Sequence, residues 1–493
     1  MLFNSFHFLI FFPVVFFLYF ALPRQLKNLL LLAASFYFYM AWKPEYIVLI
    51  LVSALTSYII AIYLQKTERQ GTRHVLLGIS IATNLLILFT FKYFNFFIST
   101  ANDVSTLFGG GTSSIIHNLI LPLGISFYTF QIISYVIDVH RAKLGAERNF
   151  FKYLLYIMFF PQLVAGPIER APHLLGQFNG THTFDYQQIT GGLKLAAWGM
   201  FKKVVIADRL AVFVDYVYQS PESFTGMPLI LATVFFAFQI YCDFSGYSDI
   251  AIGTAQTLGF NLRDNFRRPY AAKSIGEFWS RWHISLSTWF RDYVYIPLGG
   301  NRVGTGKLYI NIFLTFLISG VWHGAAWTFV AWGALHGFYL IASRLTEDIR
   351  AQGVCLFRLY KVPTLHAYLQ IVTTFFLTCV AWVLFRAQTM RDAVYIFTHS
   401  LQGIGEWFYN IAVWNTAYLN EFVFLGQDKR ELLIVVLALA FMEFVHIIQP
   451  HTHIRHMFSA YRWFVRWPLY VTIIFFLLVF GKFGERQFIY FIF

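Results

Sequence analysis

His323 stands in the middle of Leu308 to Ser343, a segment without Lys, Arg, Asp or Glu. A titratable group at the depth of a lipid bilayer costs free energy, so it is interpreted first as a functional residue. Trp322 and Gly324 flank it, and the glycine leaves room beside the imidazole. Burial disfavours the charged form of histidine, and a neutral imidazole accepts protons near pH 7. His323 is therefore a candidate general base, with a packing role between helices as the alternative.

Two further histidines accompany it. His283 lies in the segment Trp279 to Ser287, where it could share a pocket with His323 as an orienting or polarising group, or be an ordinary interfacial histidine. At about 100° per residue on one straight helix, His336 would face largely away from His323, which favours a structural role. Trp322 and His336 are retained as candidates to line the cavity.

Polar residues also gather in the apolar region from Gln239 to Asp249. Gln239, Asp243 and Asp249 could line a cavity. A carboxylate pair performs acid/base chemistry in soluble hydrolases, but in a membrane segment pairing with arginines further along the chain is favoured. No Walker A, Rossmann, HExxH or GxSxG motif accompanies them, so nucleotide-driven transport lacks its simplest support.

A basic segment, Leu262 to Lys307, offers a candidate anion site. Arg281 and Arg291, with the backbone amides of Gly299-Gly300-Asn301, could hold phosphate or pyrophosphate groups. Contact with lipid headgroups explains the same residues equally well, because tryptophans and tyrosines are interleaved with the basic residues, as in helices that lie at a membrane interface.

Composition indicates the environment in which these residues act. The chain has 493 residues, of which 58% are hydrophobic and only 12% charged, against roughly 25% charged in soluble domains. Apolar segments long enough to span hydrocarbon recur along the chain, and with shorter or broken ones they predict about ten to twelve crossings. They include Phe6–Leu22, Tyr46–Leu64, Val75–Ile98, Ile230–Leu258, Leu308–Ala342, Leu369–Phe385, Leu432–Ile448 and Trp467–Phe480.

The same features exclude other classes of protein. The net charge of +13 is assigned to orienting loops rather than to nucleic-acid binding. Three scattered cysteines without a CxxC pair argue against a disulfide framework or a metal site. The apolar amino terminus is interpreted as a retained first helix. Basic loops alternate with a glycine loop at Gly109-Gly110-Gly111, which predicts an amino terminus that faces outward.

Two breaks interrupt the middle third of the chain, at Phe160-Pro161-Gln162 and at Ala165-Gly166-Pro167. Irregular backbone at membrane depth is tolerated only when it is buried in protein or lines a watery cavity, although an ordinary loop remains the alternative. The predicted fold class is an all-α integral membrane protein with re-entrant or interfacial helices, and residues 1–493 are expected to form one membrane domain.

Several long motifs resemble those of the membrane-bound O-acyltransferase family, in the bacterial branch that contains alginate O-acetyltransferase, its peptidoglycan and cellulose relatives and the D-alanyl transfer protein of teichoic acid. They are QIYCDFSGYSDIAIG (Gln239–Gly253), FWSRWHISLSTWFRDYVYIPLGGNR (Phe278–Arg302), VWHGAAWTFVAWGALHG (Val321–Gly337), FYTFQIISYVIDVHR (Phe127–Arg141) and FFPQLVAGPI (Phe159–Ile168). The resemblance runs over essentially the whole chain in the same order, with core motifs in residues 120–345 and an aromatic carboxyl-terminal motif in 488–493.

This resemblance implies a helical bowl in which funnels from both membrane faces meet near His323 and His283. It implies acyl transfer from a cytoplasmic donor, usually acetyl-CoA, to an exported polysaccharide, with alginate as the favoured acceptor, and no permanently bound cofactor. A separate SGNH-type transferase partner and location in the bacterial cytoplasmic (inner) membrane are also implied. The carboxyl-terminal motif implies that Tyr490 carries the acyl group. A phenolic hydroxyl becomes an acyl carrier when a base removes its proton. Ile492 stands where the motif has a polar residue, and the alternative role for this motif is an aromatic membrane anchor.

Two other functions compete with this expectation. Composition alone allows a transporter or flippase for a lipid-linked sugar, but no internal repeat is visible in the sequence. A non-catalytic scaffold of a polysaccharide secretion complex is the other. Neither the acceptor nor the acyl chain is determined by the residues.

Overall fold

The protein is helical throughout the part of the chain that is described. The computed structural model describes residues 1–493 except 112–119, 165, 426, 449–460, 484–487 and 490–493, and these residues contain no strand. They divide into two compact units: unit 1 is Met1–Ala196 with Ile250–Asp264, and unit 2 is Ala197–Asp249 with Asn265–Phe493. Helices α10 (Tyr186–Met200) and α12 (Met227–Thr257) contribute residues to both units. The predicted all-α class is confirmed.

Seven helical stretches among the described residues are long and apolar enough to cross a membrane. The prediction of about ten to twelve crossings also counted shorter helices. Helices α1 (Phe6–Ala21), α2 (Arg24–Met40) and α6 (Ile125–His140) have 16, 17 and 16 residues, and such lengths fall below the roughly 20 residues of a full span. The seven are Pro44–Lys66, Gln70–Leu107, Met227–Thr257, Thr305–His323, Pro363–Arg386, Lys429–Ile448 and Trp463–Phe480.

Unit 1 is built on packed helices from the first third of the chain. Helices α3 (Ile47–Lys66), α4 (Gln70–Leu88) and α6 pack against one another, and α2 packs against α7 (Phe150–Met158). A π-helical turn, Phe89–Tyr93, continues α4 into α5 (Phe94–Leu107). Polar side chains join α3 to α4, because Asn84 Nδ2 donates to Ser57 Oγ at 3.1 Å.

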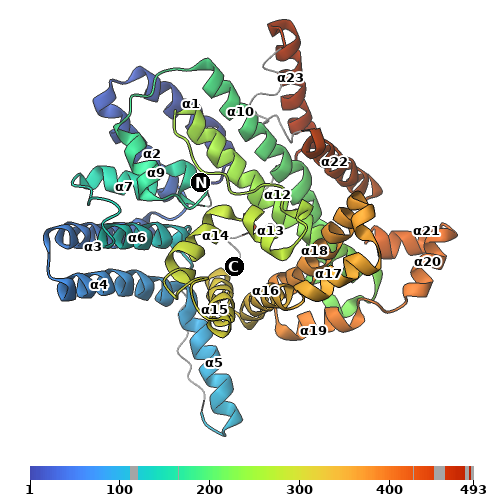
Figure 1. Cartoon of the computed structure of the whole chain (residues 1–493). Coiled ribbons are helices and arrows are strands. Elements are labelled where there is room, and N and C mark those ends of the chain that lie inside the picture. Colours follow the sequence, from blue (N-terminus) through green and yellow to red (C-terminus); the bar gives the residue numbers. More distant parts are fainter. Residues whose placement is uncertain (112–119, 165, 426, 449–460, 484–487, 490–493) are drawn as a thin grey trace. The chain divides into compact units, whose positions relative to one another are not determined.

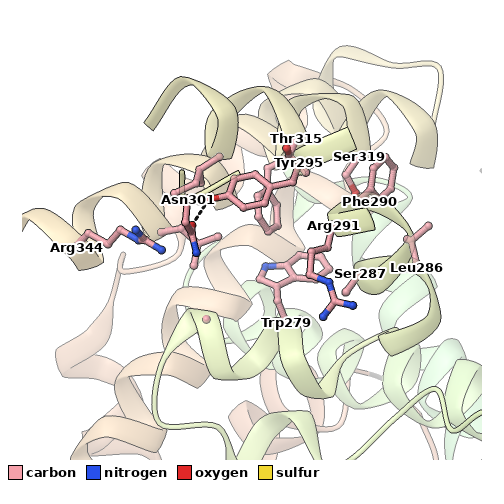
Figure 2. A pocket seen from close by; sticks show the side chains of 14 residues that line it. Trp279, Leu286, Ser287, Phe290, Arg291, Tyr295, Asn301, Thr315, Ser319 and Arg344 are labelled. Carbon is pink, nitrogen blue, oxygen red and sulfur yellow. Dashed lines mark hydrogen bonds between the residues drawn. The ribbon is translucent and has the colours of Figure 1, made fainter. Parts of the chain in front are cut away.

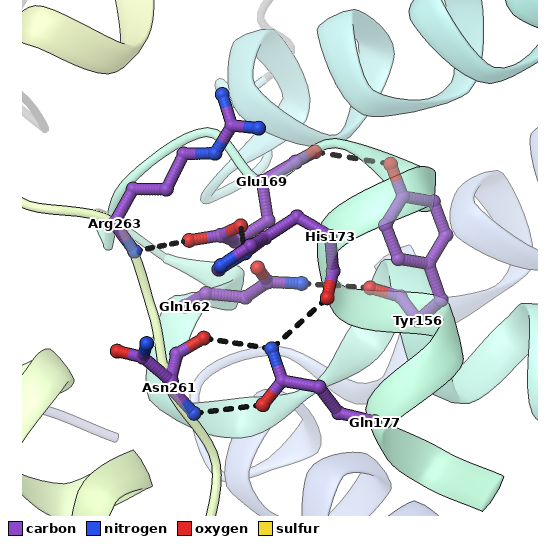
Figure 3. A network of polar contacts seen from close by, with 7 residues as sticks. All are labelled: Tyr156, Gln162, Glu169, His173, Gln177, Asn261 and Arg263. Carbon is purple, nitrogen blue, oxygen red and sulfur yellow. Dashed lines mark hydrogen bonds and ion pairs between the residues drawn. The ribbon is translucent and has the colours of Figure 1, made fainter.

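The predicted helix break in the middle third is present, and polar groups beside it find hydrogen-bond partners inside unit 1. After the short helix α8 (Phe160–Leu163) the chain becomes irregular around Glu169, which is fully buried. One oxygen of this carboxylate accepts the backbone N–H of Arg263 at 2.6 Å and the other lies 2.7 Å from His173 Nδ1, while Tyr156 donates its hydroxyl to the Glu169 carbonyl (Figure 3). The irregular backbone is thus buried in protein, as hydrocarbon requires.

Unit 2 contains the segment that holds His323, and here one expectation is wrong. The apolar stretch Leu308–Ala342 is not one straight helix but two, α15 (Thr305–His323) and α16 (Trp327–Leu345), which pack against each other (Figure 1). Gly320 and Gly333 meet at this contact: a Cβ on Gly333 would lie 2.4 Å from the Phe316 carbonyl oxygen. Small residues permit such close approach of helix backbones.

Shorter helices and further spans complete unit 2. They are the π-helical turn η4 (Phe201–Ala207), α11 (Asp208–Tyr218), α13 (Ile275–Arg281), α14 (Ile284–Phe290), the π-helical turn η7 (Arg291–Tyr295), α17 (Glu347–Leu356), α18 (Pro363–Arg386), α19 (Met390–His399), α20 (Ile404–Ala412), α21 (Thr416–Tyr418), α22 (Lys429–Ile448) and α23 (Trp463–Phe480). Helix α16 packs against α18 as well as α15, and α13 packs against both α14 and α16. His323 lies at the end of α15, where α16 and α18 supply aromatic neighbours.

Substitution Gly333→Ala tests the close contact of α15 with α16. The added Cβ has no room against the Phe316 carbonyl and the Gly320 backbone, so we expect a loss of about 1–3 kcal/mol in the free energy of unfolding. Thermal unfolding of the purified protein in detergent measures it. Gly306→Ala, also in α15 but with nothing within 4 Å of its Cβ, is the matched control. Equal unfolding temperatures for the two variants would contradict the close packing.

Candidate active site

His323 is the last residue of α15 and is almost fully buried, with 3% of its surface exposed. Three aromatic rings surround the imidazole: the ring centroids of Trp322, Trp332 and Phe385 lie 4.8, 4.9 and 5.4 Å away. The helix ends there because Gly324 takes an extended conformation. A Cβ at Gly324 would lie 2.2 Å from the Phe329 ring. The absence of a side chain at Gly324 therefore leaves room for the Phe329 ring. The sequence predicted that this glycine leaves room, and the structure shows which ring uses it.

His283 lies between α13 and α14 in a left-handed backbone conformation, with φ of 43°. This conformation is uncommon for a residue other than glycine and costs on the order of 1 kcal/mol, so the surrounding structure must hold it. The side chain is completely buried, and burial lowers the pKa of His283 to about 3. His283 is therefore a neutral imidazole at physiological pH.

Asn265 forms a hydrogen bond with His283 and with the residues that follow it. Its side-chain oxygen accepts His283 Nδ1–H at 3.1 Å, Ser285 Oγ–H at 2.9 Å and the Ser285 backbone N–H at 3.3 Å. Its backbone carbonyl accepts the N–H of Ile284 at 2.9 Å. Because Nδ1 carries the proton of the neutral ring, Nε2 is the nitrogen with the lone pair. Asn265 thereby sets both the backbone turn and the tautomer of His283.

The two predicted catalytic histidines belong to one aromatic cluster. The ring of Trp322 lies 6.4 Å from His283 and 4.8 Å from His323, so it stands next to both. Phe244 of α12 contacts His283 from another direction, at 4.6 Å between ring centroids. Unit 2 therefore brings together residues from α12, from the junction of α13 and α14, and from α15, so that both histidines border Trp322.

The expectation that His336 faces away from His323 is wrong. It assumed one straight helix, whereas His336 lies on α16, which folds back along α15. The ring of Trp332 is 4.9 Å from His336 and also 4.9 Å from His323. His336 Nδ1 accepts the indole N–H of Trp279 at 3.2 Å, so the lone pair of Nδ1 is used there. His336 therefore borders the cluster and supports Trp279.

Among the described residues the two aspartates pair with lysines, not with the arginines further along the chain that the sequence suggested. Lys203 Nζ lies 2.6 Å from Asp243, and Lys202 Nζ lies 2.8 Å from Asp249. Both lysines precede the aspartates in sequence and sit on the π-helical turn η4. Gln239 is buried in α12. A charged pair at this depth is far less costly than an isolated charge.

A cavity of about 380 Å³ runs beside α15 in unit 2. Ile312, Thr315 and Ser319 line it at helical spacing, and His323 follows Ser319 on the same helix face one turn later, about 6 Å along the axis. Figure 2 shows the side chains of Trp279 and Phe290 on the other elements that enclose it. Its volume falls in the range of small-molecule sites.

Basic and amide groups belong to the same cavity. Its lining includes the predicted residues Arg291 and Asn301 together with Arg344, which the sequence did not single out. Tyr295 donates its hydroxyl to Asn301 Oδ1 at 2.5 Å (Figure 2). The Arg291 side chain is 60% exposed and pairs with Asp292. These groups can bind an anion whose apolar remainder enters the cavity.

Other parts of the predicted anion site are arranged differently. Arg281 does not line the cavity; it pairs with Glu277 at 2.5 Å, one helical turn away. The backbone amides of Gly299 and Gly300 are used within their own turn, where they donate to the carbonyls of Ile296 and Tyr295 at 2.9 Å. The expectation that these two amides bind phosphate is therefore wrong. Tyr490 lies outside the described residues.

Sequence reasoning missed several residues of this region, for different reasons. Lys202 and Lys203 had a signal, since adjacent lysines in an apolar segment invite the same functional interpretation as His323. Asn265 and Arg344 had none, because each lies in a polar loop or helix end whose composition is ordinary. Their roles depend on partners from other segments.

The low pKa of His283 predicts how stability depends on pH. An unfolded histidine titrates near 6.5, so below this pH the unfolded chain binds a proton that folded His283 does not, and stability falls by up to about 1.4 kcal/mol per pH unit. Above pH 6.5 the contribution is fully present. In His283→Gln this group cannot titrate, so unfolding temperatures measured from pH 7.5 to 5 should fall less steeply than in the wild type. Parallel curves would contradict a neutral buried His283.

Comparison with known proteins places this cluster in a family. The profile of the membrane-bound O-acyltransferase family matches residues 36–387. A Pseudomonas putida protein named "Probable alginate O-acetylase AlgI" is 40% identical over 443 residues, which cover 89% of this chain and 86% of that protein. The peptidoglycan O-acetyltransferase of Helicobacter pylori is 36% identical over 78% of this chain and 76% of its own length.

A more distant relative, the teichoic acid D-alanyltransferase of Bacillus subtilis, is 29% identical over 47% of this chain and 61% of its own length. All three names denote transfer of an acyl group. The family match includes α12, both histidine segments and the helices that enclose them. The chain therefore belongs to the membrane-bound O-acyltransferase family and is a multi-pass membrane acyltransferase.

Proposed function

We propose that this protein transfers an acetyl group from acetyl-CoA for the O-acetylation of an exported polysaccharide, with an alginate-like polymer as acceptor. The observation that carries the proposal is the cavity beside α15, which has basic residues in its lining and runs along the helix face that ends in His323. The relatives named as alginate O-acetylase and peptidoglycan O-acetyltransferase support acetyl as the group and a glycan as the acceptor.

In this proposal His323 is the general base. The imidazole removes the proton of an accepting hydroxyl, whose oxygen attacks the thioester carbonyl; the carbon–sulfur bond breaks and coenzyme A leaves as its thiol after taking up a proton. The rings of Trp322, Trp332 and Phe385 exclude water from this histidine, which protects the thioester from hydrolysis. His283, held as the neutral tautomer by Asn265, assists as a polarising group.

The donor occupies the cavity in this proposal. Arg291 and Arg344 bind the phosphates of coenzyme A, and Asn301 binds a polar group beside them. The pantetheine arm lies along Thr315 and Ser319, whose side chains offer hydroxyl groups to its amides. This orientation directs the thioester toward His323.

The accepting hydroxyl and the later steps involve the carboxyl terminus and a partner. Tyr490 is the proposed first acceptor, and an SGNH-type transferase outside the membrane passes the acetyl group from it to the polysaccharide. The ester of a phenol transfers readily because phenolate is a good leaving group, so a two-step route through tyrosine loses little of the thioester's reactivity. The proposed location is the cytoplasmic membrane of a bacterium, since the donor is cytoplasmic and the acceptor is exported.

Substitution of His323 tests the catalytic step. In purified protein supplied with radiolabelled acetyl-CoA, we expect His323→Ala to lower the initial rate of label transfer by about 100-fold or more, the range of general-base effects. Label is counted separately on the protein and on deacetylated polysaccharide added with the partner transferase. His7→Ala, a change at an exposed histidine, should retain the wild-type rate. A His323→Ala enzyme with wild-type transfer would overturn the base assignment, and label on neither fraction would overturn acetyl-CoA as donor.

Substitution of the cavity arginines tests donor binding. Arg291→Gln and Arg344→Gln should each raise the KM for acetyl-CoA by about tenfold while kcat changes little, because a charge-assisted hydrogen bond contributes roughly 1.5 kcal/mol. Arg302→Gln removes a nearby exposed charge that does not line the cavity, so it controls for general electrostatic attraction. An equal rise in KM for Arg302→Gln would assign the effect to surface charge and not to this cavity.

A further inference from the structure

The carboxyl-terminal segment of unit 2 is attached to a buried cluster of charges. Lys203 Nζ lies 2.6 Å from Asp243 Oδ1 and 2.9 Å from Asp208 Oδ1. The three side chains are only 4–5% exposed. Gly246 lets η4 approach α12, since a Cβ there would lie 3.1 Å from the backbone nitrogen of Lys203. Burying one lysine with two carboxylates is costly, and the mechanism at His323 makes no use of it.

Asp243 has a second contact, and this contact is with the end of the chain. Its Oδ2 accepts the backbone N–H of Ile489 at 2.8 Å, while its Oδ1 faces Lys203. The preceding ring, Phe488, packs on Tyr247 and Phe244 of α12 at centroid distances of 4.7 and 5.4 Å. Phe488 and Ile489 are 1% and 4% exposed. One carboxylate therefore joins a fixed lysine to the backbone of the carboxyl-terminal segment.

The π-helical turn η4 also binds the backbone at Lys482, a few residues before Phe488. Asp208 N–H donates to Lys203 O, five residues earlier, whereas the α-helix that begins at Asp208 uses a spacing of four. Because the spacing changes from five to four residues here, the Val204 carbonyl falls outside the helical hydrogen-bond pattern. It accepts the backbone N–H of Lys482 at 2.9 Å. Lys482 Nζ further lies 3.1 Å from Glu431. A π-helical turn thus supplies a backbone acceptor that a regular helix would have used internally.

The residues that Asp243 and α12 hold, Phe488 and Ile489, lie near His283. Phe244, on which Phe488 packs, is in edge contact with His283 at 4.6 Å between ring centroids. The contacts to Lys482 and Ile489 use backbone atoms, so they place the segment whatever side chains it carries. A fixed carboxylate that accepts a backbone N–H is a strong, directional anchor because it is charged and buried.

We propose that η4 and Asp243 form a seat for the carboxyl-terminal segment, and that Lys203 and Asp243 are positioning residues that hold residues 488–489 beside Phe244 and His283. Lys203 orients the carboxylate, and Asp243 binds the backbone. The seat is a matter of binding; its effect on acyl transfer rests on the proposed function. Loss of either charge releases the segment from the histidines without altering the donor cavity.

Accessibility of position 489 tests the seat independently of activity. In a Cys355→Ser background, whose remaining cysteines Cys242 and Cys379 are buried, Ile489→Cys should react slowly with a maleimide. Adding Asp243→Asn, which cannot form the ion pair with Lys203, should raise the rate of labelling at position 489 at least tenfold. Lys203→Gln tests the same seat from the other side if Asp243→Asn does not fold.

Asp249→Asn is the matched control, because it removes the neighbouring ion pair with Lys202 between the same two elements. Its labelling rate at position 489 should equal that of the parent. All variants are compared after size-exclusion chromatography confirms folding. Equal labelling in the Asp243→Asn and Asp249→Asn backgrounds would overturn the seat and leave Lys203 and Asp243 as simple supports of helix packing.

A double-mutant cycle then tests positioning during acetyl transfer. Asp243→Asn should lower kcat by about 10–100-fold with the KM for acetyl-CoA unchanged. Combining it with Ile489→Pro, which removes the N–H that Asp243 accepts and keeps Tyr490, should lower kcat little further than Ile489→Pro alone, since Asp243 acts through that N–H. Additive losses would refute the positioning role. If no variant and no wild-type protein transfers acetyl, the proposed function fails, whereas the labelling result still decides the seat.

Discussion

A polar group at membrane depth needs a partner inside the protein, because hydrocarbon offers none. Unit 2 meets this constraint with a few buried groups that each serve several neighbours. Asn265 accepts hydrogen bonds from His283 and from both donors of Ser285. Asp243 binds Lys203 with one oxygen and the Ile489 backbone with the other. The contacts that remove the cost of burial also determine where the histidines and the end of the chain lie.

The end of α15 has a comparable effect on His323. A histidine in the middle of a long helix would be restricted to one face of that helix, whereas at a helix end it meets residues from α16 and α18 as well. The close contact of Gly320 with Gly333 brings the two helices near enough for Trp332 to touch both His323 and His336. The cavity lies beside the same helix and is lined by its residues Ile312, Thr315 and Ser319.

Much of the class and part of the site followed from local sequence. Low charge and long apolar segments predicted a helical membrane protein, and His323 in such a segment, together with His283 in the basic segment, suggested a shared pocket. Arg291 and Asn301 do line one cavity, but Arg281 is bonded to its own helix. Asp243 and Asp249 were singled out as acids in an apolar region, and Asp243 is buried whereas Asp249 is partly exposed. Arginines were expected as their partners, whereas the described structure pairs them with Lys203 and Lys202. The types of residue were predictable; their partners were not.

Hydropathy, charge and motifs are local properties, and from them the sequence alone indicated a membrane protein of an acyl-transfer family and gave His323 and His283 as candidate site residues. The tertiary structure decided that α15 ends at His323, that His336 joins the cluster, and that a lysine on η4 and the backbone at Ile489 share one aspartate. These features depend on how segments far apart along the chain pack in space, and one residue's change of helical spacing, as at η4, is enough to alter which groups meet.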